Sequence, residues 1–301
     1  MVLILIKQIV VMLIMMGIGM VLYKIGTVDE KGVGQLSNIA LFVATPCVIL
    51  QSLAIDFDAE RLKTGGWVML FFAGILALST LVGRIGCGKA DPVGTFAAIF
   101  SNSGFVGIPL ITGILGQEYV FFVTMTMVVT TVLFWTYGVY LMSGDKGEVS
   151  VKKMLTNPNL IAVVVGIVLF VAPVELPYVV KQVLAGMANM NTGLGMIILG
   201  ATLGASNIGL IITDRRLYKG ILLRLVVAPL VCVPLLLLMP VSFEVRMVMM
   251  IIAAAPAASS TSMFALKYGR DYSYGTGLTI GSVICSAVTM PIILAAAMAI
   301  L

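Results

Sequence analysis

Two apolar stretches of the chain are interrupted by residues that combine helix breakers with polar side chains. The first, SNSGFVGIP at 101–109, holds an amide, two hydroxyls and Pro109, and the second, AAAPAASSTS at 253–262, holds Pro256 and a run of hydroxyls. Each is followed, at the same offset, by a glycine, one or two charged residues and a tyrosine, Tyr119 and Tyr272 respectively. Paired interruptions in corresponding halves of a chain are typical of the substrate site of a transporter.

The chemistry that these interruptions favour is the recognition of an anion. An unpaired backbone amide or carbonyl is costly in lipid, so non-helical backbone survives only beside a cavity or buried in protein. If the two interruptions cross at mid-bilayer, the amino termini of their half-helices direct partial positive charge at the crossing. The candidate substrate-binding residues are Asn102, Ser103, Gly104, Pro109, Pro256, Ser259, Ser260, Thr261 and Ser262.

A single glycine or proline in an apolar helix more often serves packing than binding. The two clusters together reverse this preference, because their offset matches and hydroxyls, with an amide in the first cluster, lie beside the breaks. Thr45, Pro46 and Asn191 either line the same cavity or bridge neighbouring helices. Trp135 and Tyr137 belong either to an interfacial belt or to the cavity wall.

The elements that must position these residues lie in a membrane. Hydrophobic residues make up 60% of the 301 positions and charged residues only 10%, against about 25% charged in an ordinary soluble domain. The amino-terminal run at 2–23 is too long for the apolar region of a secretory signal, contains Lys7 and has no cleavage site, so it is interpreted as the first span.

Apolar runs separated by charged or Gly/Pro-rich breaks predict an all-α integral membrane protein with ten transmembrane helices. The longest charged linker, 143–157, is expected on the cytoplasmic side and separates a first repeat, 1–142, from a second, 158–301. Five helices in each half predict a five-plus-five inverted repeat, in which the fourth and ninth helices are broken and cross. The expected helices lie near 2–23, 34–55, 64–83, 94–115, 119–142, 158–173, 177–205, 217–239, 245–266 and 275–300.

Loop charges give an independent prediction of orientation. Alternate connections hold most of the basic residues, which the positive-inside rule places in the cytoplasm, with both termini outside. Arg224 falls within or just inside the eighth helix, and we expect no basic residue at the centre of a helix. The net charge of +5 is therefore attributed to topology and requires no nucleic acid.

The acidic residues and the missing histidines exclude several kinds of chemistry. All thirteen acidic residues fall in expected loops or helix ends, and the chain has no histidine. A buried carboxylate or imidazole proton relay is thus not expected. An intramembrane enzyme ranks far below a transporter, and we expect no catalytic residue, metal or cofactor, while sodium coupling stays open. The four single cysteines predict neither disulfides nor a metal site.

At these motifs the chain resembles the auxin efflux carrier family, which includes the plant PIN carriers and bacterial relatives described as malate or malonate permeases. SNSGFVGIPLITGILG is similar to the fourth-helix motif, with Asn102 and Pro109 in register, and AAPAASSTSMFALKYGRD is similar to the ninth-helix motif, with Pro256 in register. The likeness covers nearly all of the chain, with supporting similarity in SNIALFVATPCVIL, at Asn157-Pro158 and in NTGLGMIILGATLG.

The resemblance implies a fold similar to that of bile-acid symporters and NhaA-type antiporters. Helices four and nine, with five and ten, would form a transport domain that moves like an elevator past a scaffold of helices one, two, six and seven. The scaffold would often form a homodimer, and Asn102 would contact an anionic substrate. Two departures are Thr261, which stands where plant members have a second proline, and a third helix without their Asp and Lys.

The expected function is a carrier that moves small organic anions, such as dicarboxylates or auxin-like carboxylates, across a plasma membrane. The short linker and compact length favour a bacterial or archaeal inner membrane. Two alternatives stay open: a sodium-coupled organic-anion symporter of the same fold, and a non-transporting membrane sensor or scaffold.

Overall fold

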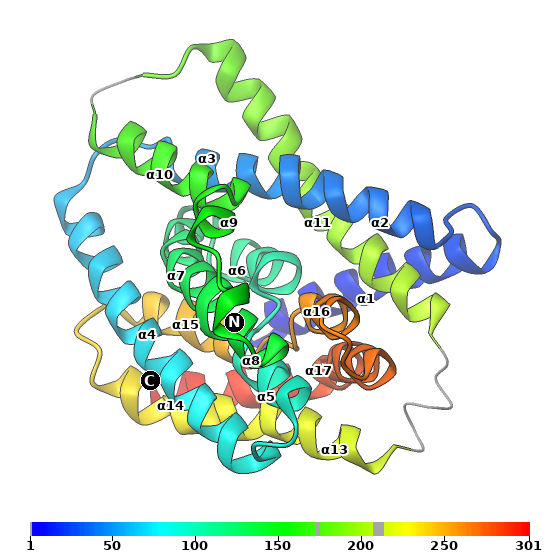
Figure 1. Cartoon of the computed structure of the whole chain (residues 1–301). Helices are drawn as coiled ribbons and strands as arrows, with labels where there is room; N and C mark the ends of the chain where they lie inside the picture. Colours follow the sequence, from blue (N-terminus) through cyan, green and yellow to red (C-terminus); the bar gives the residue numbers. More distant parts are fainter. Residues whose placement is uncertain (1, 173–174, 207–213) are drawn as a thin grey trace.

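The computed structural model describes residues 2–172, 175–206 and 214–301, and over these residues the chain is helical (Figure 1). The one β feature in the described part is an isolated antiparallel bridge between Ser101 and Ala257. Seven described helices are long and apolar enough to cross a membrane, or up to eight if the bent pair Lys146–Leu155 and Pro158–Val171 forms one span. The chain is therefore a multi-pass membrane protein.

The helices divide into two groups, each of which packs mainly within itself. In the group that we call the first bundle, α1 lies along α11, while α3 packs on α10 and α11. The close approach of α1 and α11 depends on glycines, because a Cβ at Gly200 would collide with the carbonyl oxygen of Met16. The first bundle comprises α1 (Val2–Lys24), α2 (Glu30–Ile39), the π-helical turn η1 (Ala40–Ala44), α3 (Thr45–Leu53), α10 (Pro158–Val171) and α11 (Tyr178–Ala205).

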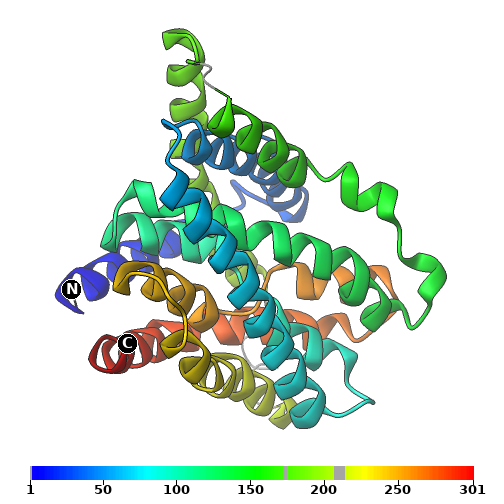
Figure 2. The ribbon, with the colours of Figure 1, turned by 90° about the vertical axis from the view of Figure 1, so that its left-hand side faces the viewer.

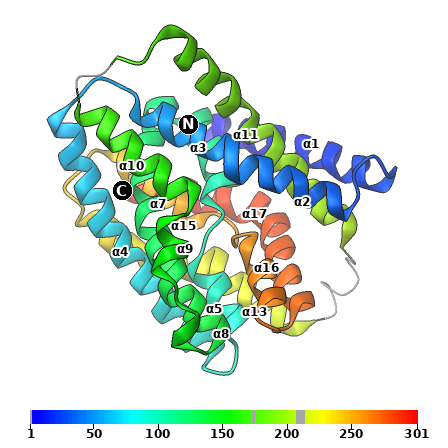
Figure 3. The ribbon, with the colours of Figure 1, turned by 45° about the horizontal axis from the view of Figure 1, so that its top comes forward.

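The second bundle contains both interrupted segments and the long helices around them (Figure 3). Its helices are α4 (Ala59–Cys87), α5 (Pro92–Ile99), η2 (Ser103–Gly107), α6 (Ile108–Ile114), α7 (Val120–Leu133), η4 (Phe134–Gly138), α8 (Val139–Ser143), α13 (Arg215–Leu222), η6 (Leu223–Val227), α14 (Ala228–Leu237), α15 (Phe243–Ala254), α16 (Ser260–Lys267) and α17 (Tyr272–Ile300). Short helical pieces lie in the connections: η3 (Gln117–Tyr119), η5 (Lys146–Glu148) and α9 (Val151–Leu155).

Acidic residues mark where helices begin, as their positions in the sequence predict. A carboxylate at a helix amino terminus accepts hydrogen bonds from amides that have no partner within the helix, and it also meets the positive end of the helix dipole. Every acidic residue lies in a loop, in a short 3₁₀ turn, or at the cap or first turn of a helix. The aspartates that cap helices or helical turns with their side chains are Asp29, Asp58, Asp91, Asp145, Asp214 and Asp271.

Three π-helical turns precede prolines at the same spacing. Pro46, Pro109 and Pro229 are each the second residue of the α-helix that follows η1, η2 and η6. Proline has no amide, and its ring clashes with the carbonyl four residues earlier, so a wider turn before it lets the segment continue. The interpretation of Pro109 as the residue that breaks its helix is therefore wrong, because the helical conformation is lost at 100–102.

The connections rich in basic residues meet at one end of the molecule, which we call the basic end. Arg270 Nε donates to the carbonyl oxygen of Met142 at 2.8 Å, and Tyr274 Oη donates to Asp91 Oδ2 at 2.8 Å. Arg216 bonds both Asp214 and Asp271, and its hydrogen bond lowers the pKa of Asp214. Both termini lie on the opposite side of the molecule (Figure 2).

Candidate functional site

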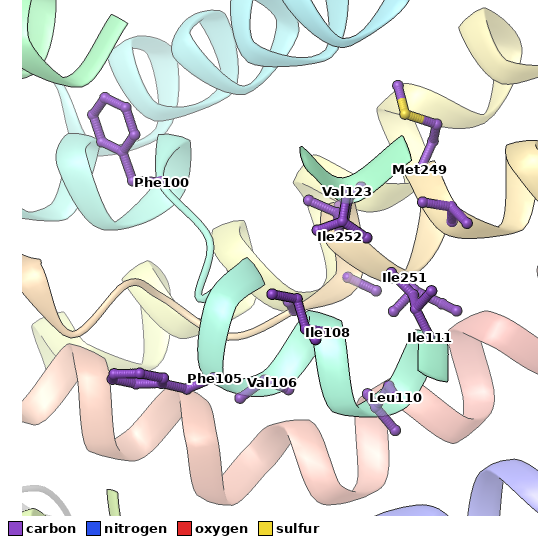
Figure 4. Packing of buried hydrophobic residues seen from close by; sticks show 14 of the residues in the cluster. Phe100, Phe105, Val106, Ile108, Leu110, Ile111, Val123, Met249, Ile251 and Ile252 are labelled. Atoms are coloured by element: carbon purple, nitrogen blue, oxygen red, sulfur yellow. The ribbon is translucent and has the colours of Figure 1, made fainter. Parts of the chain in front are cut away.

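The two interruptions lie against each other, as the sequence pattern predicts. Asn102 N donates to the carbonyl oxygen of Pro256 at 2.8 Å, and Ala258 N donates to that of Phe100 at 2.9 Å. These two bonds flank the bridge between Ser101 and Ala257. Figure 4 shows the non-helical stretch between Phe100 and Phe105, amid buried apolar side chains. The two breaks, 100–102 and 255–259, thus satisfy each other's backbone groups, and we call this pairing the crossing.

Asn102 serves both halves of the crossing with one side chain. Its Oδ1 accepts from the amide of Phe105 at 3.2 Å, which caps the helical segment beginning at Ser103. Its Nδ2 donates to Ser259 Oγ at 3.1 Å, just before α16 begins. Asn102 is 6% exposed. One buried amide therefore fixes the amino-terminal ends of two half-helices relative to each other.

Ser282 supports the second break, and sequence reasoning missed it. Its Oγ accepts from the amide of Ala257 at 3.0 Å, and Ser282 itself is buried on α17. Pro256 lies within this break, as predicted, with Ala255 in an extended conformation before it. Nothing in the spacing of Ser282 from Pro256 indicates this contact, because it depends on how α17 packs beside the crossing.

Arg224 corrects the expectation that no basic residue lies at the centre of a helix. It occupies the π-helical turn η6, between α13 and α14, and is 2% exposed. Its guanidinium donates to the backbone carbonyls at the carboxyl ends of α5 and α15. The acceptors are the carbonyl oxygens of Ala98, Ile99, Ile252, Ala253 and Ala255, at 2.9, 3.5, 3.3, 2.7 and 2.9 Å.

A cavity of about 460 Å³ lies between the two bundles, beside the crossing. Ser259 and Ser262 reach it from the break and from α16, so that Asn102 lies one hydrogen bond behind its wall. A further hollow of about 510 Å³ shares Glu30, Thr202 and Tyr272 with it and extends to Asp214 and Asp271 at the basic end. The cavity therefore leads from the crossing toward the basic end.

The wall of this cavity offers hydroxyls and apolar surface. Hydroxyls come from Ser259, Ser262 and Thr279 of the second bundle and from Ser37 and Thr202 of the first. The charged group in its described lining is Glu30, near the basic end. Such a wall can hydrogen-bond a polar group near the crossing while apolar side chains cover an organic body. The apolar part of the wall includes Met16, Leu41, Ile198, Leu199, Met263, Leu266, Ile280, Val283 and Ile284.

With this geometry established, comparison with known proteins assigns the family. The model of a family described as membrane transport protein matches residues 4–294. The chain belongs to this family, that of the auxin efflux carriers. An uncharacterized transporter of Methanothermobacter thermautotrophicus is similar to it, 26% identical over 295 residues that cover 93% of this chain and 94% of the relative. An uncharacterized transporter of Methanocaldococcus jannaschii is 23% identical over 280 residues, covering 87% and 88%.

Two further predicted residues of this family member connect the bundles. Thr45 Oγ1 donates to Asn191 Oδ1 at 3.0 Å, and Asn191 Nδ2 donates to the carbonyl oxygen of Gly104 at 3.4 Å. Asn191 is 1% exposed and does not line the cavity. Of the two alternatives left open by the sequence, the geometry fits the bridging role, and it joins α3 and α11 to the half-helix that follows the first break.

The remaining predicted residues lie outside the cavity lining. Ser103, Pro109 and Thr261 are buried, Ser260 is half-buried, and Pro46 continues α3. Trp135 lies on η4 with its ring 6.2 Å from that of Phe264. Tyr137 accepts from Arg84 Nε at 2.7 Å. Of the predicted site residues, the structure therefore gathers Asn102, Pro256, Ser259 and Ser262 around one point.

Proposed function

We propose that this protein is a secondary carrier of small organic anions that works by elevator-type alternating access. The observation that carries the proposal is the crossing itself, with two broken helices hydrogen-bonded to each other beside a cavity between two bundles. Broken helices at such a position supply half-helix ends and free backbone groups for a substrate. Membership of a transporter family supports the same reading.

The charge distribution around the crossing favours an anion. Two helical segments begin there, at Ser103 and Ser260, and helix amino termini carry partial positive charge. The carboxyl ends of α5 and α15, which carry the opposite partial charge, are occupied by the Arg224 guanidinium. Ser259 and Ser262, at and just after the second break, offer hydroxyl donors to the cavity.

The separation of the helices into two bundles supports an elevator-type movement. The second bundle holds the crossing, whereas α1, α2 and α11 of the first bundle form the facing wall of the cavity. The described polar links between the bundles are the Asn191–Gly104 bond, a bond from Gln8 Nε2 to the carbonyl oxygen of Pro109 at 3.3 Å, and a bond between the hydroxyls of Ser52 and Thr124 at 2.9 Å. Movement would break and remake these few bonds while the apolar surfaces slide.

We further infer ten crossings of the membrane. The seven long helices account for seven, the segment that contains Pro158–Val171 for one, and the two broken segments, α5 to α6 and α15 to α16, for the other two. This arrangement fits an inverted repeat of 1–142 and 158–301. The basic end would face the cytoplasm of a bacterium or archaeon, with both termini outside. A homodimer would form through the first bundle.

Two related functions remain as alternatives within the same fold. A sodium-coupled symporter would coordinate the ion with the carbonyl and hydroxyl oxygens at the crossing, which are suitable ligands for a hard cation. A sensor or scaffold would keep the crossing and bind the anion without turnover. Sodium dependence, binding and uptake measured on the same purified protein distinguish both of them from a carrier that needs no coupled ion.

The test combines binding and transport. Purified protein is screened by thermal shift against malate, malonate and indole-3-acetate, with sodium present or absent, because a ligand stabilises the state that it binds. The same acids, radiolabelled, are then offered to proteoliposomes. We expect at least one acid to raise the midpoint of thermal unfolding and to enter the proteoliposomes in a saturable manner. If both the stabilisation and the uptake require sodium, the protein is a sodium-coupled symporter.

A pair of variants links that activity to the cavity. Ser262→Trp fills the cavity beside the crossing and should abolish uptake, whereas Leu70→Trp, on an exposed position of α4, should leave it unchanged. Stabilisation without uptake would favour the sensor. If no acid stabilises the protein or enters the liposomes, the organic-anion carrier is wrong.

A further inference from the structure

Arg224 is a buried cation for which the described residues supply no carboxylate partner. Its side chain is 2% exposed, and each of its hydrogen bonds goes to a backbone carbonyl oxygen. The ion pairs of the described part of the chain lie elsewhere, on α4 and at the basic end. A charge buried within a membrane protein is costly and points to function.

The five contacts of Arg224 come from two segments that are far apart in the sequence. A guanidinium has five N–H donors in a planar fork, and here they face five carbonyl oxygens. Two of these oxygens belong to the end of α5 and three to the end of α15 and the break after it. One side chain therefore binds both half-helices where they stop before the crossing.

We propose that Arg224 is the positioning residue of the crossing, which holds the carboxyl ends of α5 and α15 together and makes the site select an anion. The second part of this inference rests on the proposed function. The last carbonyls of a helix have no amide partner within it, so two interrupted helices leave many acceptors in a place that water does not reach. The guanidinium bonds five carbonyl oxygens at these ends, of which that of Ile252 also accepts from the amide of Ala255. It keeps its charge, because arginine is not deprotonated in proteins.

The charge of Arg224 also explains why the electrostatic potential at the crossing would be positive. The carboxyl ends of α5 and α15 each carry about half a negative charge, and the guanidinium offsets both of them. The half-helices that start at Ser103 and Ser260 add their own positive ends on the other side of the crossing. An anion beside Ser259 would lie within reach of this combined potential without touching Arg224.

Hydrogen exchange tests the positioning role without any ligand. The amides of Asn102 and Ala258 bond across the crossing, so their exchange reports whether the two breaks stay paired. In Arg224→Gln, which loses the charge and most donors, we expect the peptides at 100–107 and 255–262 to exchange faster by about tenfold or more. Arg224→Lys keeps the charge and three donors, so its exchange rates at the crossing should lie between those of Arg224→Gln and the wild type.

Two controls accompany the exchange measurement. Arg246→Gln removes an arginine from α15, but one whose guanidinium bonds the carbonyl oxygen of Leu301 near the chain end, and should leave exchange at the crossing unchanged. Peptides from the α1–α11 contact should exchange alike in every variant. If Arg224→Gln does not fold, Arg224→Lys carries the test, and wild-type exchange at the crossing in that variant would overturn the positioning role.

Anion selection is measured with a matched pair of probes, phenylacetate and the uncharged phenylacetamide. If the substitution only disturbed the structure, the affinity for both probes would fall by the same factor. Loss of the charge should instead lower the ratio of their affinities by about tenfold in Arg224→Gln, and Arg224→Lys should retain the ratio. An unchanged ratio in Arg224→Gln would refute anion selection by this residue. If the wild type binds neither probe, the proposed function loses support, while the exchange result still decides the positioning role.

Discussion

At the scale of single residues, the structure gives Asn102 a second role beside the one expected from the sequence. Its Oδ1 caps a half-helix and its Nδ2 is bonded to Ser259, which lines the cavity. The second N–H of the amide has no acceptor in the described part of the chain, and the proposed substrate would reach it only past Ser259. An alanine at this position would therefore remove a helix cap, which is worth about 1 kcal/mol, together with any substrate contact.

Asn102→Ser separates these two roles. Serine is a good amino-terminal cap, so the half-helix should still begin at residue 103 and the thermal midpoint should change little. The shorter side chain removes the amide donor, and we expect the affinity for the transported anion to fall about tenfold, as for the loss of one hydrogen bond to a charged group. Isothermal titration measures this change. Wild-type affinity in Asn102→Ser would mean that Asn102 is only a cap.

Residue types alone revealed some members of this site and concealed others. Asn102, Pro256, Ser259 and Ser262 stand out because polar or helix-breaking residues are rare within apolar runs. Arg224 was recognised as lying inside a helix, but its role could not be predicted, because the carbonyls that it binds become free only when α5 and α15 stop. A serine such as Ser282 gives no signal in an apolar helix, where serine often serves packing.

At the scale of elements, the proline of the second interruption marks its break closely, whereas the first break lies well before its proline. Pro256 lies within the break at 255–259, whereas Pro109 lies within α6, ten residues after α5 stops at Ile99. The wider turn η2 accommodates Pro109, so a proline in an apolar run does not by itself locate a break. The carboxyl end of α5 is instead stabilised by tertiary contacts, which local sequence patterns do not contain.

The contact between α1 and α11 provides a prediction for element packing. A Cβ at Gly200 would collide with the carbonyl oxygen of Met16, so Gly200→Ala must push the two helices apart. Overpacking against backbone of this kind costs about 3 kcal/mol, and we expect a clearly lower thermal midpoint in detergent. Gly186→Ala on the same helix, where nothing lies within 4 Å of the added Cβ, is the matched control. Equal midpoints for the two variants would show that the bundle does not depend on this approach.

At the scale of the whole molecule, the arrangement of bundles, crossing and cavity would be one conformation of the proposed carrier. The cavity runs from the crossing to the basic end, while both termini lie at the opposite side. Under the positive-inside rule, the substrate site would then be open to the cytoplasm. In the proposed elevator movement, the few polar links between the bundles, through Asn191, Gln8 and Ser52, would have to break.

Cysteine labelling tests both the orientation and this conformation. In a background without Cys47, Cys87, Cys232 and Cys285, Ser262→Cys places a thiol in the cavity wall, and Glu118→Cys places one on the exposed η3 turn before α7. A membrane-impermeant thiol reagent should label Ser262→Cys from the cytoplasmic side and Glu118→Cys from outside. Labelling of Glu118→Cys from the cytoplasm would reverse the orientation. If Glu118→Cys reacts from outside and Ser262→Cys does too, the orientation stands but the cavity opens outward in the membrane.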